Sequence, residues 1–225
     1  MATPMFRSRH LALLIALLLI IIATPILAPL RHGLLVVNLI GAIVLIAGSY
    51  SISDRKHFLA VAIVFSATSL IGNWFMVMYP GHVAVVVAHS VTILLLSFFA
   101  ITTLAYVVRS GEVTANKIYA AICAYLLIGY AWALGYSVLE ECQPGSFGAP
   151  AEIAPGDYVN RVIEMRYFSF ITLATVGYGD IVPRSSTART MAILEAIVGQ
   201  FYLVALIGRL VGLHIVHGNP EREKS

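Results

Sequence analysis

Charge is what this sequence has least of. Asp, Glu, Lys and Arg make up only 11% of its 225 residues, whereas 60% are hydrophobic. A soluble domain of this size needs far more polar surface to cover its core, so the composition excludes a soluble domain and indicates an integral membrane protein. The net charge of +3 calls for no nucleic-acid partner, because the basic residues gather near the ends of the apolar runs.

Cysteine is also scarce, which excludes a disulfide scaffold. The chain has two, Cys123 and Cys142. The path between them is mainly helical, so they are too far apart to pair with each other. A Cys142 to Cys142 bridge between subunits and a free thiol both stay open. The sequence also lacks a paired nucleophile and base, a metal-ligand spacing and a phosphate-binding loop, so neither enzymatic activity nor an organic cofactor is expected.

Long hydrophobic runs are what the sequence has in abundance. A helix needs about 20 apolar residues to cross about 30 Å of hydrocarbon. The runs that meet this need are Leu11–Leu30, Gly33–Tyr50, Phe58–Tyr79, Val83–Val108, Ile118–Leu139 and Thr187–Ile215. The predicted fold class is therefore all-α integral membrane, with six transmembrane helices. The first run also fits a secretory signal, but it continues past Pro25, which favours a retained helix.

Basic residues predict the orientation of these helices, because Lys and Arg favour the cytoplasmic side. They flank alternate ends of the runs at Arg7, Arg9, Arg55, Lys56, Arg109, Lys117, Arg222 and Lys224. Both termini are then cytoplasmic in a cell membrane, and the loop before the last run lies outside. Its polar part, Glu140–Val162, is rich in Pro and Gly and is predicted to be an extracellular turret.

One motif lies between the last two runs. Thr175–Asp180 reads TVGYGD and follows the aromatic and hydroxyl run YFSFITLA at Tyr167–Ala174. The hexapeptide resembles the selectivity filter of tetrameric potassium channels, whose signature is TVGYG. An ordinary Gly-Tyr-Gly turn is the alternative, but the flanking apolar runs disfavour it. The resemblance implies a pore domain over residues 111–225 and a four-helix membrane bundle over residues 1–110.

The resemblance also assigns roles in this motif. The backbone carbonyls of Thr175, Val176, Gly177 and Tyr178 would replace the water shell of K⁺, and the Thr175 hydroxyl would add an inner ring. Carbonyls point the same way only if the backbone alternates in handedness, which Gly177 and Gly179 permit. One chain supplies one wall of the pore, so a homotetramer surrounded by membrane lipid is expected.

The residues before and after the filter complete the prediction. Arg166–Ala174 should be a short pore helix whose negative C-terminal end stabilises a cation, and Asp180 should form an anionic ring at the mouth. Related channels often have Trp-Trp where this chain has Tyr167 and Phe168, and some have Glu where it has Ile171. The Tyr167 hydroxyl is predicted to bond Asp180 in support of the filter, with packing at the outer interface as the alternative.

The sequence carries fewer signals for gating than for the filter. Voltage-gated relatives carry Arg or Lys at every third residue of the fourth span, and Val83–Val108 contains none. The predicted function is a potassium-selective channel that is not classically voltage-gated. The alternatives are a non-selective cation channel and a non-conducting accessory or sensor protein. Gly199 matches the hinge of related inner helices, with close helix packing as the alternative for it and for Gly208.

Three polar residues inside the spans have competing interpretations. Glu195 is either functional or, as we favour, a neutral and hydrogen-bonded acid behind the pore helix. Arg209 is expected to face a neighbouring helix or the headgroups, because a cation lining the vestibule would oppose K⁺ entry. His89 is either a pH sensor or a histidine bonded to the hydroxyl of Ser90 or Thr92.

Overall fold

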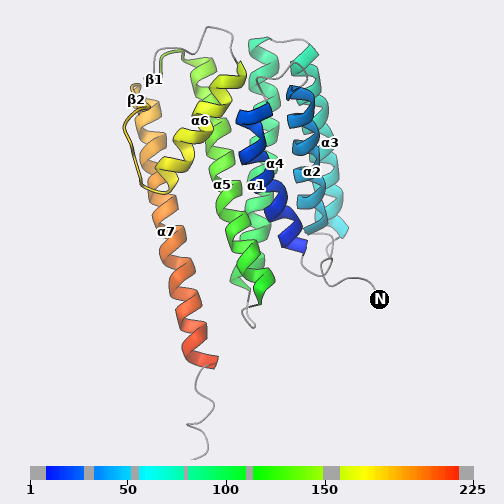
Figure 1. Ribbon diagram of the computed structural model, residues 1–225, viewed down its shortest axis with the longest axis vertical. Coiled ribbons are helices and arrows are strands. Elements are labelled where there is room, and N and C mark those ends of the chain that lie inside the picture. The colour runs from blue at the N-terminus through cyan, green and yellow to red at the C-terminus, as the bar shows by residue number, and fades with distance from the viewer. Residues whose placement is uncertain are drawn as a thin grey trace, which may run out of the picture.

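The chain folds as a set of long helices. The computed structural model describes residues 9–27, 33–51, 56–78, 81–109, 114–148 and 158–217. Its elements are α1 (Arg9–Leu27), α2 (Gly33–Ser51), α3 (Lys56–Met78), α4 (His82–Val108), α5 (Ala115–Cys142), β1 (Phe147–Gly148), α6 (Tyr158–Leu173), β2 (Val182–Pro183) and α7 (Ser186–His217). The long helices lie side by side, and the start of α1 and the end of α7 lie at the same end of the molecule (Figure 1).

The predicted apolar runs all fall on helices. Among the described residues, α1, α4, α5 and the Ser186–Leu206 part of α7 are long and apolar enough to cross a membrane. The apolar stretches described in α2 and α3 are shorter, Leu39–Ser51 and His57–Gly72. These four helices therefore suit membrane spans, while the crossing of α2 and α3 stays a prediction. Arg7, Arg55, Arg222 and Lys224, on which the orientation depends, lie outside the described residues.

Helices α1 to α5 share one aliphatic core. Because these helices are apolar on almost every side, hydrophobicity alone does not choose the face that is buried. Small residues do, because they let backbones approach closely. At Gly48 on α2, an added Cβ would lie 2.6 Å from the ring of Phe99 on α4. The core also includes Cys123 and Leu127 from α5, so it extends past the predicted domain boundary at residue 110, which stays a prediction.

Helix α6 lies against α5 and α7 beside the loop that follows it (Figure 1). The predicted pore helix, Arg166–Ala174, corresponds to the second half of α6, which begins earlier, at Tyr158, and ends one residue earlier, at Leu173. The predicted bounds of the turret, Glu140–Val162, were wrong at both ends, because helices occupy its first and last residues. Helix α5 continues to Cys142, and the Glu140 side chain accepts hydrogen bonds from the amides of Gly145 and Phe147, which stabilises the turn after it. Residues 149–157 of the predicted turret lie outside the described residues.

Two short strands connect the segments on either side of α6. Strand β1 pairs antiparallel with β2, with Phe147 opposite Pro183 and Gly148 opposite Val182. The Arg184 amide extends this contact by donating to the Ser146 carbonyl at 2.7 Å. The pairing fixes the exit of the TVGYGD segment against the end of α5. The segment is therefore held at both ends.

Candidate functional site

The TVGYGD segment starts directly at the end of α6. The amides of Ala174, Thr175 and Val176 donate to carbonyls in the last turn of that helix at 3.0, 2.9 and 2.8 Å. These bonds satisfy carbonyls that a helix end otherwise leaves unpaired. Any shift of α6 is therefore transmitted to the first residues of the segment.

The backbone of the segment alternates in handedness. Thr175, Gly177 and Gly179 have positive φ angles of 56°, 58° and 81°, and the residues between them do not. This alternation is what turns successive carbonyls to the same side. The sequence predicted it for the two glycines but missed Thr175, a β-branched residue that rarely adopts this conformation. Such strain persists only where surrounding contacts hold it, and it is typical of functional segments.

All six residues from Thr175 to Asp180 are exposed in the single chain, and Tyr178 is 73% exposed. Its ring is therefore available for contact with lipid or with another subunit. The described residues hold no group of three or more His, Cys, Asp and Glu side chains that suits a metal ion. The segment itself offers its backbone carbonyls, together with the hydroxyls of Thr175 and Tyr178 and the carboxylate of Asp180. Neutral carbonyl dipoles in a row suit a dehydrated monovalent cation.

Asp180 and Tyr167 form a hydrogen bond beside the segment. The Tyr167 hydroxyl donates to Asp180 Oδ2 at 2.6 Å, the contact that the sequence predicted, and the Ile181 amide donates to Oδ1 at 3.0 Å. The bond from Tyr167 holds the pKa of Asp180 below its ordinary value, and in turn it raises the pKa of Tyr167 to about 12. Near neutral pH the donor and the charged acceptor are therefore both present. Whether the bond supports the filter stays a prediction.

Glu195 lies at the junction of three helices. It is fully buried on α7, with Oε2 accepting from the Tyr136 hydroxyl of α5 at 2.5 Å and Oε1 lying 2.5 Å from Ser169 Oγ of α6. Ser169 Oγ also lies 2.8 Å from the Gly129 carbonyl, which can only accept. A hydroxyl has one proton to donate, so these bonds are all formed at once only if the carboxyl carries a proton of its own. The contacts are those of the hydrogen-bonded acid expected behind the pore helix.

An aromatic cluster surrounds this junction, and we call it the filter cuff. Its buried members are Tyr136, Phe147, Met165, Phe168, Ile181 and Ala188. The rings of Tyr136, Phe147 and Phe168 pack edge to face, with centroids 5.1 to 5.3 Å apart. Phe168, which donates no hydrogen bond, thus packs against the other rings. The sequence analysis missed Tyr136, Ser169 and Phe147, because only the tertiary structure brings them beside the helix that carries the TVGYGD segment.

Gly199 on α7 lies against the end of α6. A Cβ placed there would be 2.1 Å from the Leu173 carbonyl oxygen, so close packing alone requires glycine at this position. The hinge role of Gly199 stays a prediction. Gly208, by contrast, has open space around its Cα. Both glycines lie on α7, but only Gly199 is at a position where a side chain would clash with its surroundings.

Arg209 faces a neighbouring helix, α4, which is one of the two positions that the sequence predicted for it. Its Nη1 donates to the Val108 carbonyl at 2.6 Å and its Nη2 to the Arg109 carbonyl at 2.7 Å. A cation at the C-terminal end of a helix is stabilised by the carbonyls that end leaves unpaired. This contact joins the inner part of α7 to the last turn of α4.

His89 and the cysteines complete the residues named from the sequence. His89 is buried. The nearby Thr92 hydroxyl bonds with the Ala88 carbonyl and the Ser69 hydroxyl. The structure therefore leaves open whether His89 is a pH sensor or a histidine bonded to a neighbouring hydroxyl. Cys123 is buried, Cys142 is exposed, and both are free, as expected for two cysteines that do not pair with each other.

Comparisons with known proteins agree with this site. Residues 153–213 match the family described as "Ion channel". The range contains all of α6, the TVGYGD segment and most of α7. Together with the apolar helices, the match supports a multi-pass membrane protein in which this segment is similar to an ion channel domain.

The curated relatives are plant proteins that match only in part. "Two-pore potassium channel 4" of Arabidopsis thaliana is 41% identical over 56 residues, which is 25% of this chain and 20% of the relative. "Two pore potassium channel a" of Oryza sativa subsp. japonica is 29% identical over 86 residues, which is 38% of this chain and 21% of the relative. The chain thus spans about a fifth of the length of these relatives. No solved structure matches significantly.

Proposed function

We propose that this chain is one subunit of a potassium-selective channel. Four copies would surround one axis, and the carbonyls of Thr175, Val176, Gly177 and Tyr178 would coordinate K⁺ within the filter. The observation that carries this proposal is the alternating backbone at Thr175, Gly177 and Gly179 inside the range that matches an ion channel. The names of the plant relatives support K⁺ as the ion.

The exposed surface of the pore half supports the homotetramer. Large apolar side chains are exposed along α7, namely Ile193, Leu194, Ile197, Val198, Phe201 and Val204. These side chains and the exposed Tyr178 are available for contact with neighbouring subunits and with lipid. In this assembly all six long helices cross the cell membrane, the termini are cytoplasmic, and the filter faces outward.

Ion flux from liposomes tests the proposal. Purified full chain in liposomes should pass K⁺ and Rb⁺ and largely exclude Na⁺, because the carbonyl rings suit the desolvation of the larger ions. Equal fluxes of Na⁺ and K⁺ would instead identify a non-selective cation channel. Absence of any flux from folded tetramers would favour an accessory protein.

Two glycine variants sharpen this test. Gly177→Ala should abolish K⁺ flux, because its φ of 58° strains any residue with a Cβ. Gly145 has a φ of 85° and lies outside the filter, so Gly145→Ala introduces the same kind of strain elsewhere. We expect flux to persist in Gly145→Ala. Equal loss in both variants would show general destabilisation rather than a filter.

A weak dependence on voltage is also expected. Helix α4 contains no Lys or Arg to move through the field, and each elementary charge moved through 100 mV supplies only about 2.3 kcal/mol. A conductance–voltage curve in planar bilayers should therefore be shallow. A curve that requires several gating charges would contradict this assignment of the bundle.

A further inference from the structure

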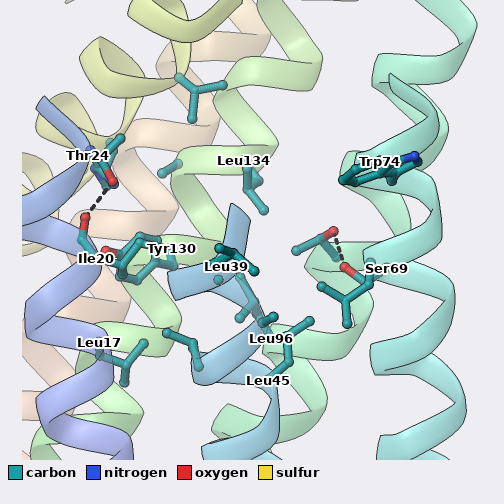
Figure 2. A pocket seen from close by; sticks show the side chains of 18 residues that line it. Leu17, Ile20, Thr24, Leu39, Leu45, Ser69, Trp74, Leu96, Tyr130 and Leu134 are labelled. Carbon is teal, nitrogen blue, oxygen red and sulfur yellow. Dashed lines mark hydrogen bonds between the residues drawn. The ribbon is translucent and has the colours of Figure 1, made fainter. Parts of the chain in front are cut away.

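The bundle encloses a cavity that the proposed pore does not use. It has a volume of about 520 Å³ and is lined by residues of α1 to α6. Most of its lining is aliphatic and includes Leu17, Ile20, Leu45, Leu96 and Leu134 (Figure 2). Sites for small molecules typically measure about 300 to 1,000 Å³ and combine such a lining with a few polar groups. The cavity therefore has the size and polarity of a ligand site.

A buried cation lies at one end of this cavity. Arg166 on α6 lines the cavity and is only 8% exposed. Its Nη1 donates to Thr24 Oγ1 of α1 at 3.1 Å, and its guanidinium carbon lies 5.8 Å from the centre of the Tyr130 ring of α5. Both partners are neutral. Within the described ranges, Tyr130 Oη is also buried without a hydrogen-bond partner.

No acidic side chain neutralises this arginine in the part of the chain that the structure describes. The ion pairs found there join Glu141 to His82 and to Arg161. The buried Glu195 is bonded to Tyr136 and Ser169 instead. A buried charge without a counter-ion is costly, so an anion at this end of the cavity would be strongly favoured.

The opposite end of the cavity opens to the surroundings of the bundle. Leu39 of α2 and Trp74 of α3 line it and are 65% and 57% exposed. Figure 2 shows Trp74 across the cavity from Thr24 and Tyr130. In a membrane protein, an apolar opening of this kind faces lipid tails. A ligand would therefore enter sideways from the bilayer and reach Arg166 at the inner end.

We propose that this cavity binds a long-chain carboxylate, with its carboxylate on Arg166 and its chain along the aliphatic lining. A carboxylate matches the two parallel donors of a guanidinium, which strengthens the pair. A single chain with a small head can move its head to the inner end of the cavity. A diacyl phospholipid has a large headgroup that is held at the bilayer surface, and a lateral opening does not admit it to Arg166.

Occupancy would act on the pore helix. Arg166 belongs to α6, whose last turn accepts the hydrogen bonds from Ala174, Thr175 and Val176. A ligand that holds Arg166 against α1 and α5 would therefore restrain the filter. This consequence rests on the proposed channel function, whereas binding itself does not.

Quenching of Trp74 fluorescence measures the binding without any flux. The chain has two tryptophans, Trp74 and Trp132, so full-length Trp132→Phe protein reports from the cavity alone. It is placed in nanodiscs of zwitterionic lipid and titrated with dibromostearate. We expect saturable quenching, with binding weakened about tenfold to a hundredfold by Arg166→Met because a charged hydrogen-bonded pair is lost. Arg189→Met removes an exposed cation outside the cavity and should leave the binding unchanged.

Two further comparisons separate the cavity from general membrane partitioning. Gly41 lines the cavity and has only Ile20 Cδ1 within 4.0 Å of an added Cβ, so Gly41→Leu should fit, fill the space and abolish binding while Arg166 remains. Dibromostearate methyl ester lacks the charge and should bind at least tenfold more weakly to the Trp132→Phe protein itself, a comparison that needs no change in the cavity.

Three outcomes would overturn the proposal. Equal quenching by the acid and its methyl ester would mean that Arg166 does not select the head. Unchanged binding in folded Arg166→Met and Gly41→Leu proteins would mean that the exposed Trp74 reports ordinary lipid contact. Equally tight, saturable quenching by brominated phosphatidylglycerol would mean that a phospholipid occupies the cavity.

Discussion

The chain has two main buried cores, and they are built from different residues. The bundle core is mainly aliphatic, with Leu13, Leu17, Leu95 and Leu127 fully or almost fully buried beside one buried aromatic ring, Phe99. The filter cuff is richer in aromatic residues, which are three of its six buried members, and it lies beside the buried hydrogen bonds of Glu195. The bundle leaves a cavity of about 520 Å³ beside its core. The filter cuff, by contrast, is crossed by edge-to-face ring contacts.

This difference follows from what each core has to position. Aliphatic contacts are non-directional, so helices of the bundle can be stable without a single exact register. Hydrogen bonds and edge-to-face rings depend on angle as well as distance, and they fix the helix that carries the strained TVGYGD segment. We therefore expect bundle substitutions to change stability, and filter cuff substitutions to change stability and conduction together.

The largest effect is expected at Glu195. Glu195→Leu leaves the buried Tyr136 hydroxyl without an acceptor, at a cost of about 1–3 kcal/mol, whereas Ser169 keeps its bond to the Gly129 carbonyl and loses only its second bond, at about 1 kcal/mol. We expect a loss of about 4 kcal/mol in unfolding free energy and loss of K⁺ flux. The unfolding free energy is measured by denaturant unfolding in detergent, and the K⁺ flux is measured in liposomes.

Glu195→Gln is the matched control. A Gln side chain accepts from Tyr136 and donates to Ser169, as a protonated carboxyl does. Stability and flux should stay close to those of the parent protein. A Gln variant as unstable as the Leu variant would show that the charged carboxylate is required, contrary to the proton count.

Leu95→Ala tests the bundle core. Leu95 is fully buried in this core, and its truncation should cost about 3 kcal/mol through lost burial and a new cavity. The preference for K⁺ over Na⁺ should not change in the protein that remains folded. The unfolding midpoint and the flux ratio are the measurements. A change in selectivity would contradict the expectation that substitutions in the bundle core alter stability alone.

Gly199→Ala tests the contact between α7 and the end of α6. The added methyl overlaps the Leu173 carbonyl, so α6 must shift, at a cost of about 2 kcal/mol. Flux should fall, because the same end of α6 holds the filter. Gly208→Ala is the control, since open space surrounds that position. A Gly199→Ala protein with parental stability and altered opening alone would favour the hinge.

The smallest effect is expected for Tyr167→Phe, which removes one donor and keeps the ring. The variant should assemble normally and lose current faster during sustained opening. The contribution of the bond is present above the ordinary Asp pKa of 3.8 and is lost as pH falls through the lower pKa of Asp180. Tyr167 keeps its proton up to a pH of about 12. The difference between variant and parent should thus stay constant between about pH 5 and pH 9. Equal current stability over minutes would leave Tyr167 as packing alone.

Much of the architecture was readable from the sequence. Long apolar runs predicted the positions of all the long helices, because backbone groups in a bilayer must bond within their own segment. The motif predicted left-handed backbone at Gly177 and Gly179, because these residues have no Cβ to resist it. Tyr167 and Asp180 were paired from the resemblance to potassium channels, in which an aromatic donor on the pore helix bonds the aspartate that follows the filter.

Tertiary structure alone decided the support around the filter and the cavity beside it. The partners of Glu195 come from α5 and α6, at Tyr136 and Ser169, and nothing in their local sequence indicates a carboxyl 59 or 26 residues away. Thr24 and Arg166 meet across 142 residues. Helices that are apolar all round carry no signal for which faces will meet, because hydrophobicity is nearly equal on every side. Shape and the needs of a few buried polar atoms make that choice.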